Sequence, residues 1–179
     1  KMRVRTLLLG CALMILAIAS ARPQWGHLDR AEVKRGASLL IALDVSRSML
    51  AADVRPNRLE CAKVDILDLI ADLKGDRAGL LAFRGKGVML CPLTSDYAFL
   101  RQAVDGVGIE SAPRGGKDIA DALEKALSAL ETSGADNCAI VLISDGEDLA
   151  GRAASAAKKA AERSIPIFAV GIGDPAGTD

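Results

Sequence analysis

Aromatic residues, histidine and net charge are all scarce in this 179-residue sequence. Phe, Trp and Tyr together make up 3% of the residues, His27 is the single histidine, and 23 Lys and Arg residues balance 23 Asp and Glu residues. Proteins that bind nucleic acid combine a basic surface with aromatic side chains on which bases stack. We therefore expect no nucleic-acid partner. His27 lies beside the apolar N-terminal run, where we expect it to be solvated and not catalytic.

Cysteine is also sparse, and its spacing excludes the common metal and disulfide frameworks. The four cysteines are scattered along the chain, and none forms a closely spaced pair of the kind that binds zinc. Three of them, Cys61, Cys91 and Cys138, fall in the globular part. An odd number does not suit a set of disulfides. We expect them to be unpaired thiols that pack as small core residues.

The N-terminal segment is the one long apolar run of the sequence. Fifteen uncharged residues, 7–21, follow Lys1, Arg3 and Arg5. A membrane-spanning helix needs about 20 apolar residues, with a lower limit of about 17, so a signal peptide cleaved near the small residues 19–21 is the alternative to a transmembrane helix. We predict a membrane segment over residues 1–22 and a juxtamembrane linker over residues 23–37. The basic residues should keep the N-terminus in the cytoplasm and direct the following domain outward.

From Ser38 onward, the hydrophobic pattern alternates between strands and helices. The strands are expected at residues 38–44, 78–83, 88–90, 139–144 and 165–172, and the helices at residues 58–73, 97–107, 119–130 and 150–163. Asn57 and Asp118 are the expected N-caps, and Pro92 should end the strand at 88–90. Most strands are apolar on both faces, which is typical of parallel sheets covered by helices. The prediction is an α/β, doubly wound, mostly parallel sheet with helices on both faces and one short antiparallel edge strand.

Oxygen-bearing side chains follow two of these strands. Asp44 ends the first strand and is followed by Ser46 and Ser48, while Asp145 follows the strand at 139–144. In a doubly wound sheet, two such strands flank the point where the strand order reverses, and ligands bind at their carboxyl ends. Carboxylates and hydroxyls without nitrogen or sulfur ligands suit a hard cation, Mg²⁺ above all. The predicted metal ligands are therefore Asp44, Ser46, Ser48 and Asp145.

These residues resemble the von Willebrand factor A (VWA) domains, whose metal-ion-dependent adhesion site (MIDAS) begins with Asp-x-Ser-x-Ser. Asp44, Ser46 and Ser48 match that motif, and Asp145 matches the family's aspartate in a Ser/Thr-Asp-Gly turn. The segments LDVSRSMLAADVRPNRLE, GDRAGLLAF, CPLTSDY and LISDGED resemble more narrowly the membrane-anchored Bat-type (aerotolerance) bacterial proteins. The resemblance implies a VWA domain over residues 38–179 whose last strand and helix, like a C-terminal membrane helix, lie beyond this sequence.

One position departs from the family pattern. Where the resemblance implies a threonine hydroxyl on the loop before the third helix, this sequence has Lys117, in GGKDIADAL. A lysine is a compact, mobile positive charge that seeks carboxylates. We expect Lys117 to weaken a site for Mg²⁺ or Mn²⁺. The alternative is that Lys117 replaces the metal as a permanent counter-ion of Asp44 and Asp145, which would leave an inert scaffold.

The resemblance implies a binding module and not an enzyme. In that role, an Asp or Glu side chain of a protein partner completes the metal shell. The Bat-type resemblance also implies an inner-membrane protein with its VWA domain in the periplasm, acting with MoxR-type ATPases and other VWA proteins in envelope assembly or stress tolerance. An alternative is a haloacid-dehalogenase-like phosphotransfer enzyme, since Asp44, Lys117 and the pair Asp145 and Asp148 occur in that order. Ser46 stands where that chemistry needs a second aspartate as general acid.

Overall fold

The computed structural model describes residues 3–6, 10–14, 36–115, 118–135, 137–146 and 153–174. The chain divides into two compact units, residues 1–33 and residues 34–179. In the first unit, residues 3–6 and 10–14 are helical and exposed. Within the described stretches, no helix has the length and apolar character needed to cross a membrane. Most of the predicted membrane segment lies outside the described residues.

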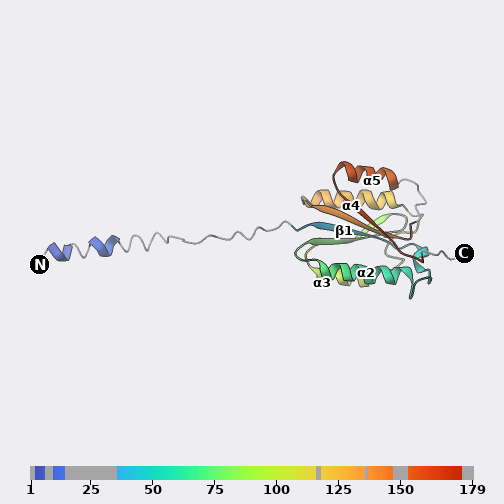
Figure 1. The fold of residues 1–179 in the computed structure, drawn as a ribbon, viewed down its shortest axis with the longest axis horizontal. Coiled ribbons are helices and arrows are strands. Elements are labelled where there is room, and N and C mark those ends of the chain that lie inside the picture. Colours follow the sequence, from blue (N-terminus) through green and yellow to red (C-terminus); the bar gives the residue numbers. More distant parts are fainter. Residues whose placement is uncertain are drawn as a thin grey trace. The chain divides into compact units, whose positions relative to one another are not determined.

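The second unit is a five-stranded sheet with helices on both faces (Figure 1). The strand order is β3-β2-β1-β4-β5; β3 runs antiparallel to β2, and the other pairs are parallel. The predicted α/β fold is thus confirmed. The elements are β1 (Ser38–Asp44), the short 3-10 helix η1 (Arg47–Leu50), α2 (Arg58–Asp72), β2 (Arg77–Phe83), β3 (Gly87–Thr94), α3 (Tyr97–Asp105), α4 (Ile119–Ser133), β4 (Cys138–Ser144), α5 (Ala153–Glu162) and β5 (Ile167–Gly171).

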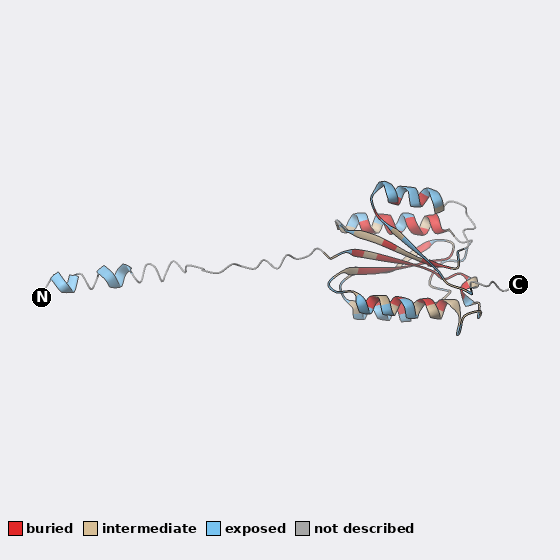
Figure 2. Cartoon of the chain, viewed as in Figure 1, coloured by how far each residue is buried: buried red, intermediate tan, exposed pale blue. Residues whose placement is uncertain are grey.

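β1 is the central strand because its side chains are apolar on both faces. Ile41 and Leu43 pack into the core on one side of the sheet, and Leu40 and Ala42 pack into the core on the other. The strand lies between β2 and β4 with every residue paired to β2. Figure 2 shows buried residues concentrated along the strands and on the inward faces of the helices. Asp44, the last residue of β1, is thereby carried to the carboxyl edge of a rigid sheet.

Two layers of helices cover the sheet, each with a buried apolar stripe. α2 and α3 contribute Ile66 and Leu100 to one core, and α4 and α5 contribute Leu123 and Ala156 to the other. The predicted N-caps are confirmed: the side chain of Asn57 accepts a hydrogen bond from the backbone N–H of Glu60, and Asp118 accepts one from Asp121. Such caps satisfy backbone donors that the first turn leaves unpaired.

One sequence prediction about the edge of the sheet was wrong, and one short helix in the first loop was not predicted. β3 is not a short strand ended by Pro92; it has eight residues and continues to Thr94. Because β3 is an edge strand, the missing N–H of proline need not break a ladder hydrogen bond. The sequence reading also missed η1, which turns the chain directly after β1 and buries Met49.

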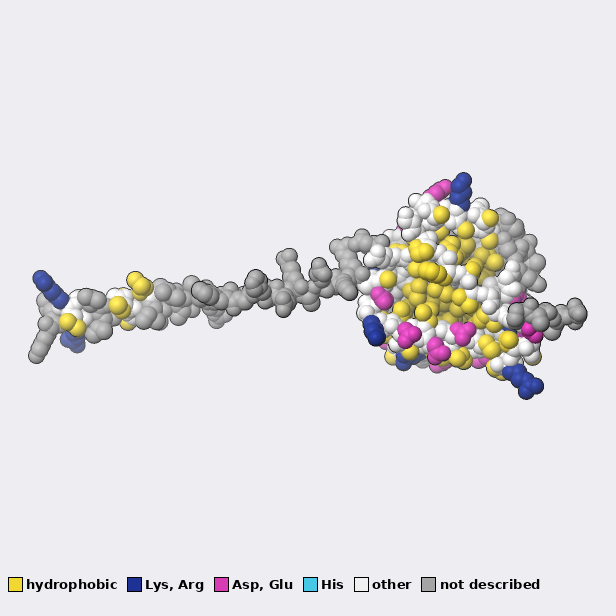
Figure 3. All heavy atoms as spheres, viewed as in Figure 1, with side chains coloured by type: hydrophobic (Ala, Val, Ile, Leu, Met, Phe, Trp, Pro, Cys, Tyr) yellow, Lys and Arg dark blue, Asp and Glu magenta, His cyan; other side chains and the backbone are white. Residues whose placement is uncertain are grey.

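The edge of the sheet formed by β5 carries exposed apolar side chains. On β5, Phe168 is 58% exposed and Val170 is 40% exposed. Figure 3 shows hydrophobic side chains gathered on the visible face of the domain, between the two helix layers. Large exposed apolar patches are typical of surfaces that contact protein, membrane or ligand.

The loop before α4 is held against the end of β2 by two glycines. A Cβ atom on Gly85 would lie 2.5 Å from the Cα atom of Gly115. Neither backbone can yield without shifting its loop, so both positions require the absence of a side chain. This contact fixes the glycine-rich loop at the same edge of the sheet as Asp44.

We predict that Gly85→Ala lowers the free energy of unfolding by about 1–3 kcal/mol, because the added methyl group overlaps backbone atoms. Gly106→Ala is the matched control, since its Cβ would lie 3.5 Å from the Gln102 carbonyl oxygen and its φ is −76°. The control should be neutral or slightly stabilising. Urea unfolding of the two variants and the parent measures both effects. Equal stabilities of the two variants would contradict the predicted contact.

Candidate metal site

Asp44 is the most buried charged side chain at the carboxyl edge of the sheet. Its side chain is fully buried, and its two oxygens are oriented by different elements. Oδ1 accepts a hydrogen bond from the backbone N–H of Ser46 at 2.8 Å, and Oδ2 accepts one from Oγ of Ser144 at 2.9 Å. Because Ser144 ends β4, the two parallel strands jointly fix this carboxylate.

The two serines that follow Asp44 are brought together by η1. The N–H of Met49 donates to the carbonyl oxygen of Ser46 at 3.1 Å, and the Met49 side chain is buried beneath the turn. The Oγ atoms of Ser46 and Ser48 lie 2.9 Å apart. The alternate spacing in the sequence therefore becomes a close pair of hydroxyls beside a buried carboxylate.

Asp145 follows β4 and is almost completely buried, with 2% of its side chain exposed. Its Oδ2 lies 3.4 Å from Nη1 of Arg58, the first residue of α2. Arg58 also binds Asp53 through Nε, at 2.9 and 3.1 Å, and through Nη2, at 2.8 Å. The guanidinium thus bridges the loop before α2 to the end of β4.

The Arg58 guanidinium lowers the pKa of Asp53 well below its usual range, chiefly through these hydrogen bonds. The backbone N–H of Asp174, just after β5, adds a further hydrogen bond to Asp53 at 2.8 Å. Asp53 therefore stays ionised in the folded domain, although only 3% of its side chain is exposed. The ion pair ties together three loops at one edge of the sheet.

Arg58 and Asp53 were not among the residues singled out from the sequence. The sequence does contain a signal, because a positive charge in the first turn of a helix opposes the helix dipole. Such a residue is expected to have an acidic partner. Lys117, in contrast, was singled out, but it lies outside the described residues, as does Asp148. The expected role of Lys117 stays a prediction.

The residues of this cluster fit a small divalent cation. Two adjacent ligands of an octahedral Mg²⁺, each about 2.1 Å from the ion, are separated by about 3.0 Å. The Ser46 and Ser48 hydroxyls lie 2.9 Å apart, the length of the hydrogen bond between them, and this spacing is compatible with two adjacent ligands of one ion. Asp44 and Asp145 supply negative charge, and all four side chains offer oxygen. Within the described stretches, no group of three or more His, Cys, Asp or Glu side chains is placed to hold a metal. The candidate site accordingly depends on its hydroxyls.

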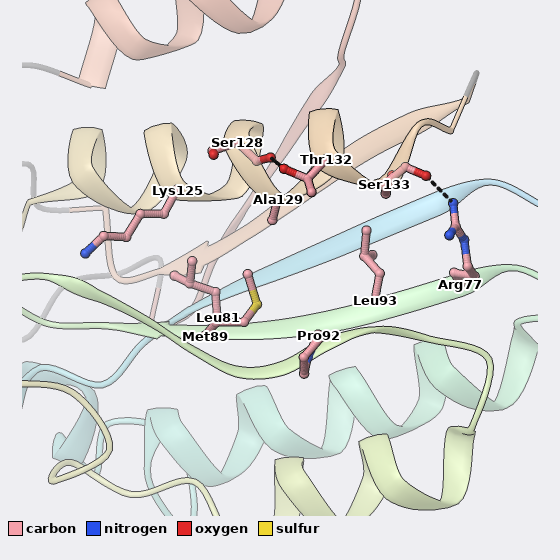
Figure 4. A pocket seen from close by; sticks show the side chains of 10 residues that line it. All are labelled: Arg77, Leu81, Met89, Pro92, Leu93, Lys125, Ser128, Ala129, Thr132 and Ser133. Atoms are coloured by element: carbon pink, nitrogen blue, oxygen red, sulfur yellow. Dashed lines mark hydrogen bonds between the residues drawn. The ribbon is translucent and has the colours of Figure 1, made fainter.

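A separate groove lies between α4 and the strands β2 and β3 (Figure 4). Its volume is about 550 Å³, and its walls are mainly apolar, with Leu81, Met89 and Leu93 below α4. Arg77 and Lys125 also line it, but no Asp, Glu, His or Cys does. The groove carries hydroxyls of Ser128, Thr132 and Ser133 but no carboxylate, imidazole or thiol, and it shares no residue with the Asp44 cluster.

The sequence model for the von Willebrand factor type A domain matches residues 39–147. The chain belongs to this family. A UPF0353 protein of Mycobacterium ulcerans is 30% identical over 190 residues, which cover 97% of this VWA chain and 55% of that protein. The VWA chain thus spans about half the length of such relatives.

Two solved structures are similar in both sequence and fold. An aerotolerance-related membrane protein from Bacteroides fragilis has a TM-score of 0.75 and 35% identity, covering 80% of this chain and 71% of that one. BatB from Bacteroides thetaiotaomicron has a TM-score of 0.72 and 36% identity, covering 76% and 66%. The predicted resemblance to Bat-type VWA proteins is confirmed.

Ser144→Ala tests how far this edge depends on the buried carboxylate. The change removes the hydroxyl that donates to Asp44 and leaves one buried oxygen without that donor. We predict a loss of about 1.5–3 kcal/mol in the free energy of unfolding, typical of a hydrogen bond to a charged group. Ser128→Ala, on the exposed face of α4, is the control and should change stability little. Chemical denaturation that finds the two variants equally stable would show that Asp44 does not need Ser144.

Proposed function

We propose that this VWA domain is a binding module that engages a protein partner through a divalent cation, Mg²⁺ or Mn²⁺, held by Asp44, Ser46, Ser48 and Asp145. The observation that carries the proposal is the pair of hydroxyls 2.9 Å apart beside a buried carboxylate. The bound ion would supply a positive centre with a coordination position for an oxygen of the partner.

The partner should present an Asp or Glu side chain, because a carboxylate is the strongest oxygen ligand that a protein can offer to such an ion. The surface around the site would be formed by residues 44–50, 113–118 and 145–148, which follow the carboxyl ends of the strands or precede α4. Leu50 in η1 is 45% exposed, although it is apolar. It could act as a small hydrophobic anchor next to the cation, as is common at the centre of protein interfaces.

The Bat-type relatives support a proposed cellular setting. One of the similar structures is described as an aerotolerance-related membrane protein. Together with the basic residues Lys1, Arg3 and Arg5 before the apolar run, this supports an inner-membrane protein whose VWA domain faces the periplasm. Its partners would include a MoxR-type ATPase and other VWA proteins, in envelope assembly or stress tolerance.

A binding role also accounts for the site better than catalysis does. A phosphatase of the haloacid-dehalogenase type would need a general acid at the position of Ser46, and a serine cannot serve. Ser46 and Ser48 bond to each other, and no histidine lies in the described residues to activate either of them. The remaining alternative is an inert scaffold in which Lys117 takes the place of the metal.

Titration calorimetry of Mg²⁺ and Mn²⁺ into the 179-residue chain separates these alternatives. The parent should bind one ion, and Asp44→Ala should weaken binding by more than about tenfold. Asp72→Asn, which changes an exposed carboxylate at the end of α2, is the control and should bind the ions as the parent does.

A second experiment tests the protein partner. Envelope proteins retained on the immobilised parent in Mg²⁺ should be released by EDTA and should not be retained by Asp44→Ala.

A parent that takes up neither ion at millimolar concentration would rule out the metal-dependent module and favour the inert scaffold. Metal binding that persists unchanged in Asp44→Ala would place the ion elsewhere in the chain.

A further inference from the structure

We infer that Arg58 sets both the affinity of the Asp44 site for divalent cations and its preference for Mg²⁺ over Ca²⁺. This inference rests on the proposed function, since it concerns the same cation. It assigns a role to a residue outside the Asp-x-Ser-x-Ser motif, 87 residues away from Asp145 in the sequence.

Arg58 is held firmly by Asp53. Its Nε and Nη2 atoms bind Asp53 at 2.8–3.1 Å, in the two-pronged geometry that fixes a guanidinium most strongly. Asp53 is itself held by the backbone N–H of Asp174 at 2.8 Å. Arg58 is therefore not a mobile surface charge. It cannot leave when a cation enters without breaking this partly buried ion pair.

The positive charge of Arg58 acts on one of the proposed metal ligands. Nη1 of Arg58 lies 3.4 Å from Oδ2 of Asp145, so part of the negative charge of this carboxylate is already neutralised. Two positive charges that share one carboxylate also repel each other, and the effect is strong where solvent is excluded. Arg58 should therefore weaken the binding of every divalent cation at this site.

Arg58 also restricts how the carboxylate of Asp145 can coordinate a cation. Ca²⁺ commonly takes both oxygens of a carboxylate and six to eight ligands, whereas Mg²⁺ takes six ligands in a compact octahedron. Arg58 occupies Oδ2 of Asp145, and both oxygens of Asp44 accept hydrogen bonds from Ser46 and Ser144. Two-oxygen ligation by Asp145 would have to displace Arg58. The constraint therefore lowers the affinity of the site for Ca²⁺ more than its affinity for Mg²⁺.

The test compares calorimetric titrations of Mg²⁺ and of Ca²⁺ into the 179-residue chain. Arg58→Gln removes the charge and should tighten Mg²⁺ binding by about tenfold and Ca²⁺ binding by at least threefold more than that, which lowers the selectivity ratio. Arg58→Lys keeps the charge without the fork and should leave Mg²⁺ affinity within about threefold of the parent. Loss of Arg58 would leave the Asp53 carboxylate without its ion-pair partner. Circular dichroism must therefore first show that each variant is folded. Arg58→Lys also serves as the variant that best retains the fold.

Arg163→Gln is the matched control. Arg163 also forms an ion pair, with Glu131 at 2.8 Å, but both side chains are about half exposed and lie at the C-terminal ends of α5 and α4, not on the loops that carry the site. Arg163→Gln removes the same net charge as Arg58→Gln and should leave the affinities for Mg²⁺ and Ca²⁺ unchanged. If Arg58→Gln and Arg163→Gln both bind Mg²⁺ and Ca²⁺ as the parent does, Arg58 has no such role, and the metal site itself still stands. If neither the parent nor Arg58→Gln binds either ion, the proposed metal site fails, and the inference fails with it.

Discussion

The arrangement of this domain's functional edge depends on one buried carboxylate, that of Asp44. A charged group without partners is costly inside a protein, so the chain around it must supply hydrogen-bond donors. Ser46 supplies its backbone N–H, which requires the sharp turn into η1, and Ser144 supplies a hydroxyl, which requires β4 to lie beside β1. The same two requirements place the Ser46 and Ser48 hydroxyls after β1 and Asp145 after β4, at the same edge of the sheet. Satisfying the carboxylate and building the candidate site are thus the same structural event.

A second, partly buried charge network lies at the same edge of the sheet. Arg58 joins Asp53 and Asp145, and Asp53 joins the chain after β5 through Asp174. Buried ion pairs of this kind contribute little net stability, but they are strongly destabilising when one partner is lost. Their benefit here is placement, because one guanidinium fixes the N-terminus of α2 relative to the ends of β4 and β5. A cation at the Asp44 site would be bound in the field of this fixed positive charge.

Much of the fold could be predicted from local sequence. The segment Ser38–Asp44 is apolar on both faces and could only be a central strand, while Asn57 and Asp118 marked the helix starts because their side chains cap free N–H groups. Pro92 misled the prediction of where the strand ends, although the edge position was expected, because an edge strand can continue through a proline whose missing N–H is not needed for pairing. The contact of Arg58 with Asp145 joins residues 87 positions apart, and no local pattern could give that pairing. Asp44, Ser46 and Ser48 could be predicted as a group from the sequence, because a single turn brings them together.

The central claim is that the oxygens of Asp44, Ser46, Ser48 and Asp145 form a divalent-cation site, and the most direct measurement is the position of a bound Mn²⁺ ion. Crystals of the protein grown with Mn²⁺ should show an anomalous scattering peak about 2.2 Å from Oγ of both Ser46 and Ser48, with coordination by oxygen alone. A difference in the Mn²⁺ peak between parent and Ser46→Ala crystals would tie the ion to that hydroxyl. A peak elsewhere on the domain, or none at this edge with Mn²⁺ in millimolar excess, would contradict the account.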